Sequence, residues 1–245
     1  WSFIKELNLH PNEVSKTLLS AIENTVGLNK TIVFPSFTSA EFVKNKKFDI
    51  LLSIPKESGI IPTEALNSNK YIRTLQPLHS YLIKGPKSNE IKYLDLKTSW
   101  GPGSILDWLS KNETRIVKIG IPWNISFSYL HRFEEIYSVP WRYFKEFRGN
   151  LYKNNNFISP ITENKYVGPK NINFSYDYSP LIKLLRKNKV FISSKNKKFK
   201  IESVLTKDVD KIAKNFFENN PWQIIKNKKI IKKWISENKY REEQF

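Results

Sequence analysis

The chain has 245 residues, 40% of them hydrophobic and 14% aromatic, which is typical of a globular protein and excludes a disordered one. It contains no cysteine, so disulfides, thiolate catalysis and cysteine zinc sites are excluded. It has three histidines, which are too few to suggest a histidine-rich metal site, so no metal site is expected. The formal net charge of +18 favours an anionic partner, but it is equally typical of a composition rich in Lys, Asn and Ile. No apolar run approaches the ~18 residues of a spanning helix, and no secretory signal pattern begins the chain, so we expect a cytoplasmic protein.

The first hundred residues alternate between predicted helices and predicted strands. Pro11–Val26 repeats apolar residues at helical spacing, with Gly27 as the C-terminal cap. Thr31–Phe34 is typical of a short buried strand, and Pro35 is expected to end it. The other elements expected here are a buried strand or helix at Phe48–Ile54, a short helix at Thr63–Leu66, and strands at Tyr71–Leu75, Ser80–Lys84 and Glu90–Leu96.

A capped helix, a strand and a second helix are predicted in the middle of the chain. Ser104 is placed to cap the first helix, with Asp107 at the acidic position of a capping box. A strand is predicted from the apolar and mostly β-branched residues Ile116, Val117, Ile119 and Ile121, and Gly120 is expected to break it. The next helix is predicted over Phe127–Tyr137, where aromatic and aliphatic residues repeat at helical spacing.

Residues 150–175 are rich in Asn and lack periodicity, so we expect loops with short strands there. Pro140–Gly149 carries aromatic and basic side chains together, which is more typical of a half-buried surface than of a ring-binding site. The remaining expected elements are a helix from Ser179 through Leu185, a hairpin of Val190–Ile192 and Phe199–Val204, and helices after Thr206 and around Ile230–Ile235. Strands and helices alternate over the first 140 residues, which favours a sheet covered by helices.

One histidine has acidic neighbours at helical spacing. His131, Glu134 and Glu135 lie three and four residues apart, so the imidazole can share a helix face with either carboxylate. A histidine and a carboxylate on a helix that follows a strand and a turn are suited to acid–base catalysis. The same spacing is also that of a surface histidine beside two solvated acids, and on spacing alone the surface interpretation is favoured, because such pairs are common on solvated faces.

The common short motifs of enzyme chemistry are missing from the sequence. It has no GxGxxG and no GxxxxGK[ST], so neither dinucleotide nor P-loop binding is indicated. It has no GxSxG and no HExxH either. A set of Ser, His and Asp can be drawn from almost any chain of this length and carries no weight. No nucleic-acid-binding module is found, so that class of partner rests on charge alone.

Four segments, in order, resemble the aminoglycoside 3-N-acetyltransferase family, which has the antibiotic acetyltransferase fold and not the GNAT fold. They are VGLNKTIVFPSFT, GIIPTEALNSNKYIRTLQPLHSYLIKG, SILDWLSKNETRIVKIGIPWNISFSYLHRFEE and NPWQII, and the resemblance covers about Trp1 to Ile225. It implies an α/β protein with a mixed central β-sheet flanked by helices, a single acetyltransferase domain over residues 1–245, and acetyl-CoA as co-substrate. It also implies a further strand and a Ser-bearing loop upstream of Trp1.

The resemblance implies roles for individual residues. His131 matches the catalytic histidine of the family's LHxxE motif, and Glu134 matches its acidic partner. An imidazole with an unperturbed pKa near ~6.5 is suited to take a proton from the acceptor amine, which then attacks the thioester directly. The family's second acidic motif falls near residues 168–177, where Asp177 is the nearest acid. The implied coenzyme A residues are Ser36, Thr38, Arg73, Thr74 and Ser80, and the implied substrate residues are His79, Glu135 and Trp123.

The chain departs from the family pattern in the segment expected to hold the coenzyme. Gln76 stands where the family's HP motif has its histidine, and His79 occupies a position that is His in only some members. Apart from the resemblance, Arg73 has the character of an ordinary surface charge, and Thr74 and Ser80 that of strand-edge hydroxyls.

The acceptor is expected to be an amino sugar, carried on a nucleotide, a lipid phosphate or a glycan. A net charge of +18 repels a polycationic drug at encounter, which opposes the alternative of an aminoglycoside substrate and a role in antibiotic resistance. A second alternative is a non-catalytic sugar- or polyanion-binding protein on the same scaffold. We expect small-molecule partners, neither nucleic acid nor a membrane span, and an oligomeric state that the sequence leaves open, a dimer included.

Overall fold

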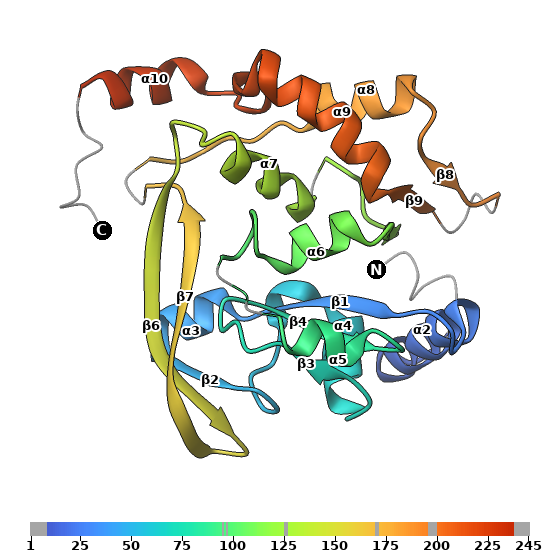
Figure 1. The fold of residues 1–245 in the computed structure, drawn as a ribbon. Helices are drawn as coiled ribbons and strands as arrows, with labels where there is room; N and C mark the ends of the chain where they lie inside the picture. Colours follow the sequence, from blue (N-terminus) through green and yellow to red (C-terminus); the bar gives the residue numbers. More distant parts are fainter. Residues whose placement is uncertain are drawn as a thin grey trace. The chain divides into compact units, whose positions relative to one another are not determined.

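The computed structural model describes residues 9–94, 96, 98–124, 127–169, 172–195 and 200–237. Its helices and strands are labelled in Figure 1. Backbone contacts divide the chain into two compact units. Unit 1 comprises Trp1–Ser99 and Glu146–Asn164, and unit 2 comprises Trp100–Lys145 and Lys165–Phe245. The single domain expected from the sequence stays a prediction.

Unit 1 is built on a small antiparallel sheet with the strand order β1-β4-β3. Its elements in chain order are α2 (Pro11–Val26), β1 (Ile32–Phe37), α3 (Ser39–Asn45), β2 (Lys47–Asp49), η1 (Lys56–Ser58), α4 (Ile60–Asn67), β3 (Ile72–Arg73), β4 (His79–Lys84) and α5 (Ser88–Lys92). Buried Leu19 of α2, Ala65 and Leu66 of α4, and Leu82 of β4 form one apolar cluster. Burial of these side chains therefore attaches both helices to the sheet.

Three predictions in unit 1 need correction. The buried strand or helix expected at Phe48–Ile54 is limited to the end of β2 at Asp49, and Leu52 and Ile54 beyond it are exposed. Strand β1 continues through Pro35 to Phe37, because β1 is an edge strand of its sheet and an edge position tolerates a residue that lacks the N–H. A strand was expected at Glu90–Leu96, but residues 90–92 belong to the short helix α5, which buries Ile91, and residue 95 lies outside the described residues. One buried apolar side chain per turn satisfies a short helix, and a strand would have required alternation.

A long hairpin of β6 (Tyr143–Lys153) and β7 (Asn156–Val167) is shared by the two units. Figure 1 shows it in yellow, with the two strands running side by side in opposite directions. Asn154 and Asn155 both have positive φ, of 50° and 64°, as the favoured two-residue hairpin turn requires. The prediction of loops with short strands over 150–175 was therefore wrong for most of that segment.

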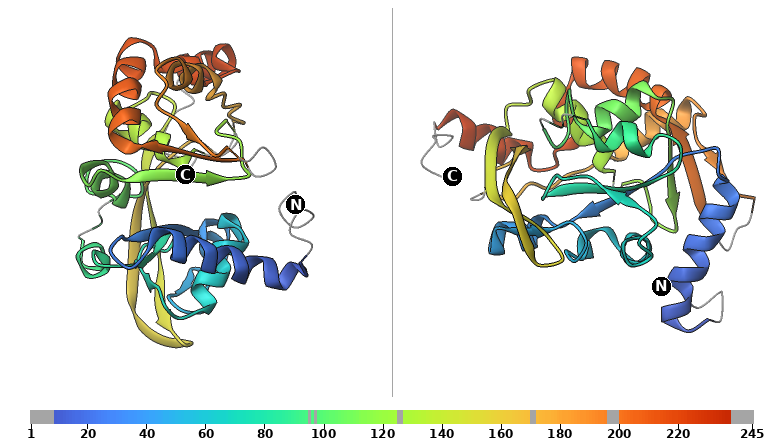
Figure 2. Two further views of the ribbon diagram at one scale, coloured as in Figure 1. Left: turned by 90° about the vertical axis from the view of Figure 1, so that its right-hand side faces the viewer. Right: turned by 60° about the horizontal axis from the view of Figure 1, so that its bottom comes forward.

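Unit 2 contains the sheet β5-β9-β8 and the helices packed around it. Its elements are α6 (Ile105–Lys111), β5 (Arg115–Ile119), η2 (Ser128–Leu130), α7 (His131–Ile136), α8 (Ser179–Lys187), β8 (Ile192–Ser193), β9 (Ile201–Leu205), α9 (Thr206–Asn219), η3 (Pro221–Ile224) and α10 (Lys228–Ser236). Strands β5 and β9 pair antiparallel and lie side by side in Figure 2. Ser104 caps α6 by accepting from the Asp107 backbone N–H at 3.2 Å, as predicted.

The hairpin predicted from residues 190–204 is confirmed by the pairing of β8 with β9, although its turn at 196–199 lies outside the described residues. Within the described ranges, no helix is both long and apolar enough to cross a membrane.

Candidate active site

The candidate site in unit 2 begins with a histidine at the first position of α7. Strand β5 ends at Ile119, and Gly120 turns the chain with a positive φ of 70°. The 3-10 turn η2 then leads directly into α7 at His131. Glu134 lies three residues later on the same face, and its Oε2 accepts from His131 Nδ1. The His131 side chain keeps 22% exposure, while that of Glu134 keeps none.

Three groups hold the buried Glu134 carboxylate. Besides His131, the Trp141 indole N–H donates to Oε1 at 3.0 Å, and Arg142 Nη2 lies 3.1 Å from Oε2. Burial alone would raise the pKa of the Glu134 carboxyl, but Arg142 and His131 outweigh burial and hold that pKa well below its usual value. The carboxylate therefore stays charged at neutral pH and orients the groups around it.

Arg142 connects this pair to neighbouring side chains. Its Nη2 lies 3.2 Å from His131 Nδ1 and donates to the Tyr176 hydroxyl at 2.9 Å. Its Nη1 donates to the Tyr166 carbonyl at 2.8 Å. The side chain is 10% exposed and its guanidinium has a fixed fork of donors, so these contacts fix its position beside the imidazole.

The contacts determine which nitrogen of His131 can act as a base. A carboxylate cannot donate, so the hydrogen bond to Glu134 requires a proton on Nδ1 and leaves Nε2 as the basic nitrogen. Burial lowers the pKa of His131, and the positive charges of Arg142 and Lys165 lower it further, while Glu134 opposes them. The net result is a pKa below the usual value, so the imidazole is neutral at pH 7.

Aromatic rings surround the imidazole. The ring centroids of Trp100, Tyr176 and Tyr178 lie 5.2, 6.0 and 6.4 Å from that of His131. Tyr176 and Tyr178 are stacked on each other with centroids 5.6 Å apart. Residues two apart in an extended segment share a face, which explains why both tyrosines reach the histidine. These rings exclude water from one side of the base.

Three further predicted residues of unit 2 have other surroundings. Asp177 lies between the two tyrosines, and its carboxylate accepts from the Ser179 backbone N–H at 2.9 Å. Trp123 is buried against Phe127 and Phe191. Glu135 is buried beside Gly101, so close that a side chain at that glycine would overlap the carboxyl group. Their predicted roles are not apparent from these contacts and stay predictions.

The residues predicted for coenzyme A come together in unit 1 as a buried network. Arg73 donates to Ser80 Oγ at 3.0 Å, to the Ser53 carbonyl at 2.6 Å and to the Ser36 carbonyl at 3.0 Å. Arg73 is 3% exposed, and burial lowers its pKa to about 10. Thr74 Oγ1 accepts from the Tyr81 N–H at 2.9 Å. Arg73 is thus a buried residue that joins three segments, and not the surface charge that its residue type suggests.

The other two hydroxyls of this set are also buried. Thr38 Oγ1 donates to the Pro77 carbonyl at 2.7 Å. Ser36 Oγ has no hydrogen-bond partner among the described residues, so it is the member of the set with a free capacity to bind. His79 is 3% exposed and lies 3.2 Å from Glu163, a residue that the sequence did not single out.

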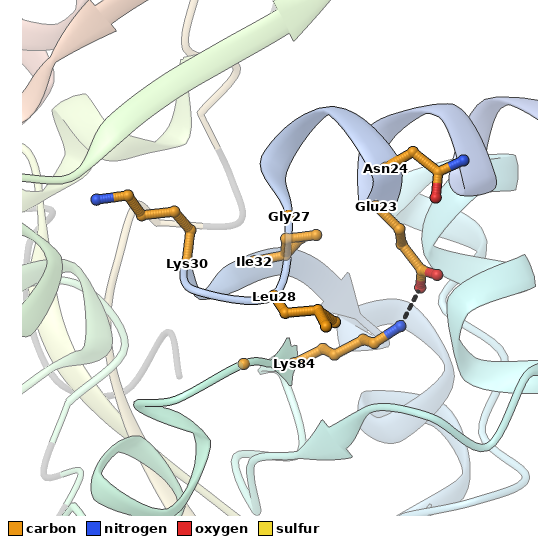
Figure 3. Close-up of a pocket in the computed structure, with 8 residues that line it drawn as sticks. Glu23, Asn24, Gly27, Leu28, Lys30, Ile32 and Lys84 are labelled. Atoms are coloured by element: carbon orange, nitrogen blue, oxygen red, sulfur yellow. Dashed lines mark ion pairs between the residues drawn. The ribbon is translucent and has the colours of Figure 1, made fainter.

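A surface pocket of about 300 Å³ also lies in unit 1. Figure 3 shows Glu23 and Lys84 joined across it by an ion pair of 2.9 Å, while the Lys30 side chain points away. The described residues that line it are Glu23, Asn24, Gly27, Leu28, Lys30, Ile32, Lys84 and Gly85. They include none of the residues predicted for the coenzyme or the substrate, so the pocket gives those predictions no support.

Sequence reasoning missed the partners that complete the unit 2 site. Trp141 and Arg142 lie in the aromatic and basic segment Pro140–Gly149, whose composition is more typical of a half-buried surface. The alternation of Phe174, Tyr176 and Tyr178 was the available signal for an aromatic face on an extended segment. Arg142 carried no signal of its own, because only the fold shows that it is buried beside a carboxylate.

Comparisons with known proteins agree with the resemblance in the sequence. The family model described as aminoglycoside 3-N-acetyltransferase matches residues 3–218. A search of curated proteins gave no match by sequence. Among solved structures, the binary complex of AAC-IIIb with CoASH matches with a TM-score of 0.68 at 15% identity, over 84% of this chain and 83% of that chain.

Two further solved structures match in the same way. A mutant of aminoglycoside acetyltransferase AAC(3)-IVa in complex with a gentamicin has a TM-score of 0.66 at 13% identity, over 84% of this chain and 76% of that chain. The YokD protein from Bacillus subtilis has a TM-score of 0.65 at 14% identity, over 84% and 85%. The α/β class and the expected fold are confirmed, with the described strands distributed over three sheets of three strands each.

Proposed function

The chain belongs to the aminoglycoside 3-N-acetyltransferase family, and from this premise we propose that His131 is the general base of an acetyl transfer to a sugar amine. Family membership makes the protein an acetyl-CoA-dependent acyltransferase. The observation that supports His131 is its hydrogen bond to the buried, charged Glu134, which leaves Nε2 basic.

In the proposed reaction, the acceptor enters as an ammonium ion and His131 Nε2 takes its proton. The neutral amine attacks the acetyl carbonyl carbon, a C–N bond forms, and the C–S bond to coenzyme A breaks. The nitrogen loses its second proton to the leaving thiolate, and the imidazolium then returns the first proton to solvent. Glu134 stabilises the imidazolium that forms, and Arg142 restrains its carboxylate. General base catalysis of this kind contributes roughly 10² to 10⁴ in rate. The chain has no cysteine, so no acyl-thiol intermediate of the protein is involved.

The predicted coenzyme residues fit this proposal in one respect. Ser36 Oγ is buried and without a hydrogen-bond partner among the described residues, as expected of a group that binds a ligand. The other predicted coenzyme residues are buried and bonded to protein groups; they are Thr38, Arg73, Thr74 and Ser80. We propose that they support the coenzyme-binding segment without contacting the coenzyme.

Two acceptor classes are proposed. The net charge of +18 favours an amino sugar that is neutral or carries phosphate, because like charges repel at encounter. An aminoglycoside is favoured by the family, one of whose solved folds holds a gentamicin. Electrostatic steering by the net charge acts at long range during encounter and is screened by salt, whereas local contacts decide the affinity of the bound acceptor. The net charge therefore concerns the encounter and the family resemblance concerns the bound state.

Thiol release from acetyl-CoA, measured with a panel of amino sugars and aminoglycosides, tests the function. We expect release with at least one primary amine, and a loss of roughly 10² to 10⁴ in kcat/KM for His131→Ala. His10→Ala is the matched control, because that histidine is exposed and lies in unit 1. No release with any amine, together with no thermal shift on adding acetyl-CoA, would support the non-catalytic alternative instead.

A further inference from the structure

A second histidine of the chain has the surroundings of a base, although the proposed function assigns it no proton transfer. His79 is buried in unit 1, and one of its ring nitrogens faces a carboxylate while the other faces a hydroxyl. Nδ1 lies 3.2 Å from Glu163 Oε1, and Nε2 lies 3.4 Å from the Ser39 hydroxyl. We propose that Ser39, His79 and Glu163 form a nucleophile, base and acid, and that Ser39 accepts an acyl group from a small activated ester or thioester.

The acid of this set is held in a fixed orientation. Glu163 Oε2 accepts from the Leu78 N–H at 2.7 Å, and Oε1 accepts from the Ser99 hydroxyl at 2.5 Å. Burial alone would raise the pKa of Glu163, but the hydrogen bonds from His79, Ser99 and Leu78 outweigh burial and lower it. A charged carboxylate beside Nδ1 favours the tautomer with a proton on Nδ1, which leaves Nε2 without a proton and able to take one from Ser39 during the reaction.

The proposed nucleophile is the most exposed of the three side chains, as nucleophilic catalysis requires. Glu163 and His79 are buried, whereas Ser39 is partly exposed at the first position of α3. Its hydroxyl donates to the Leu78 carbonyl at 3.1 Å, which places the oxygen beside the imidazole, and its proton must turn from that carbonyl to Nε2 when the nucleophile is activated. A nucleophile near a base, with the base oriented by a third group, is the recurring arrangement of serine acyl transfer. The contact between a nucleophile and its base is often loose before a ligand binds, which fits the 3.4 Å between Ser39 and Nε2.

A purely structural role would explain only half of this arrangement. The bond between His79 and Glu163 joins β4 to β7 and requires one ring nitrogen. It does not require the other nitrogen to face a partly exposed hydroxyl. The Phe37 ring packs edge-on against the imidazole, with centroids 4.9 Å apart, and restricts its rotation. Both nitrogens are therefore held at their partners.

The proposed step transfers the acyl group from the donor to Ser39. The Ser39 Oγ–carbon bond forms while its proton moves to His79 Nε2, and the C–S or C–O bond of the donor breaks. The proton then passes to the leaving thiolate or alkoxide. Water releases the acyl group as a carboxylic acid by the same route. The step requires no residue of the proposed unit 2 site, so its failure and the failure of the proposed function are distinguishable.

Covalent labelling of the full chain with a fluorophosphonate tests the proposal, because such a probe forms an Oγ–P bond only at an activated serine and releases fluoride. We expect one adduct, located on Ser39 by peptide mass spectrometry, and none in Ser39→Ala. The labelling rate in His79→Gln is expected to fall roughly 10²-fold or more. Wild-type labelling should also increase with pH as an imidazole loses its proton, which a structural histidine would not produce.

Ser15 is the internal control, because its hydroxyl is bonded directly to a carboxylate, that of Glu64, at 3.1 Å. Ser99 is bonded to the Glu163 carboxylate in the same way. Labelling of Ser39 no faster than that of Ser15 would overturn the proposal. Equal labelling of wild type and His79→Gln would do the same. If His79→Gln does not fold, hydrolysis of p-nitrophenyl acetate decides, since folded Ser39→Ala must then lose the activity that wild type shows.

Discussion

The Trp141 indole N–H donates a 3.0 Å hydrogen bond to Glu134 Oε1, the carboxylate oxygen that does not face His131. This bond fixes the second oxygen, so the first is directed at the imidazole. Because a buried carboxylate would otherwise rotate or be left under-bonded, Trp141 is a positioning residue for the proposed base.

The first prediction concerns that bond. Trp141→Phe removes the donor and should lower the free energy of unfolding by about 2 kcal/mol, with a clear loss in kcat. Trp222→Phe is the control, because the ring centroids of Trp222 and Trp141 lie 4.5 Å apart. Trp222 thus shares the ring packing, whereas the hydrogen bond to Glu134 comes from Trp141. Chemical denaturation and steady-state kinetics measure both effects. Equal loss of activity in the two variants would show that ring packing, and not the hydrogen bond, is what matters.

The second prediction concerns the pH profile. The neutral form of His131 is the base, and its pKa lies below the usual ~6.5. As pH is lowered, kcat/KM should therefore stay constant past pH ~6.5 and fall only in more acidic solution. Arg142→Gln removes a positive charge beside Nδ1, which raises that pKa and moves the acidic limb to higher pH.

Arg142→Lys keeps the positive charge and should move the acidic limb less than Arg142→Gln does. NMR titration of the three histidines measures the same shift directly. An acidic limb that stays in place, or that moves to lower pH in Arg142→Gln, contradicts the assignment.

The third prediction concerns stability in acid. The pKa of Glu134 is lower in the folded state than in the unfolded chain, so it contributes stability that is fully present above pH ~4.5 and lost as pH falls through the folded value. Glu134→Gln leaves Arg142 without its counter-ion and should cost about 3 kcal/mol or more at pH 7. The difference from wild type should shrink below pH ~4.5. Urea unfolding at pH 7, 5 and 3 checks this, and a difference that stays constant would be inconsistent with a charged Glu134.

The fourth prediction separates Asp177 from its neighbour Tyr176. Asp177 bonds the Ser179 N–H at the start of α8, so Asp177→Asn should change stability by at most about 1 kcal/mol and kcat little. Tyr176→Phe removes the hydroxyl that accepts from Arg142 and should lower kcat/KM several-fold. Kinetics of the two variants under one set of conditions decides. A greater loss in Asp177→Asn would restore Asp177 as the second catalytic acid.

The fifth prediction concerns Arg73. A lysine has its three donors on one nitrogen, whereas Arg73 bonds from three different nitrogens of a planar fork. Arg73→Lys should therefore lower the free energy of unfolding by about 2 kcal/mol or more. If Arg73 supports the coenzyme-binding segment without touching the coenzyme, Arg73→Lys should raise the KM for acetyl-CoA only by loosening that segment. Salt should not alter this rise in KM. A large, salt-sensitive rise in KM with unchanged stability would instead indicate direct contact with phosphate.

Much of the fold follows from local patterns in the sequence. The bounds of α2, the cap of α6 at Ser104 and the pairing of β8 with β9 depend on neighbours within a few residues, and all were predictable. The β6–β7 hairpin was missed because its large apolar side chains do not keep to the buried face: Phe144, Phe157 and Ile158 are exposed, while Lys145 occupies a half-buried position. Its Asn154–Asn155 turn was the available signal.

The site was predictable only in part, for a related reason. The spacing of His131 and Glu134 on one helix determines their contact, whatever the rest of the chain does. Arg142 reaches them from outside the helix, and Tyr176 from a distant segment of the chain, so neither contact has a local pattern. The burial of Arg73 was equally hidden, because its three partners come from three different segments.

The segment with Tyr176 is tied to residues close to the end of the chain. Tyr176 forms an antiparallel bridge with Ile225, and Lys226 N–H donates to the Ser175 carbonyl at 2.8 Å. Asn227 bonds the same segment from its side chain. During synthesis on the ribosome, His131 and Glu134 emerge long before these residues do. The aromatic face beside the base is therefore completed only after residues 225–227 are available, and a nascent chain should remain inactive until residue 227 has emerged.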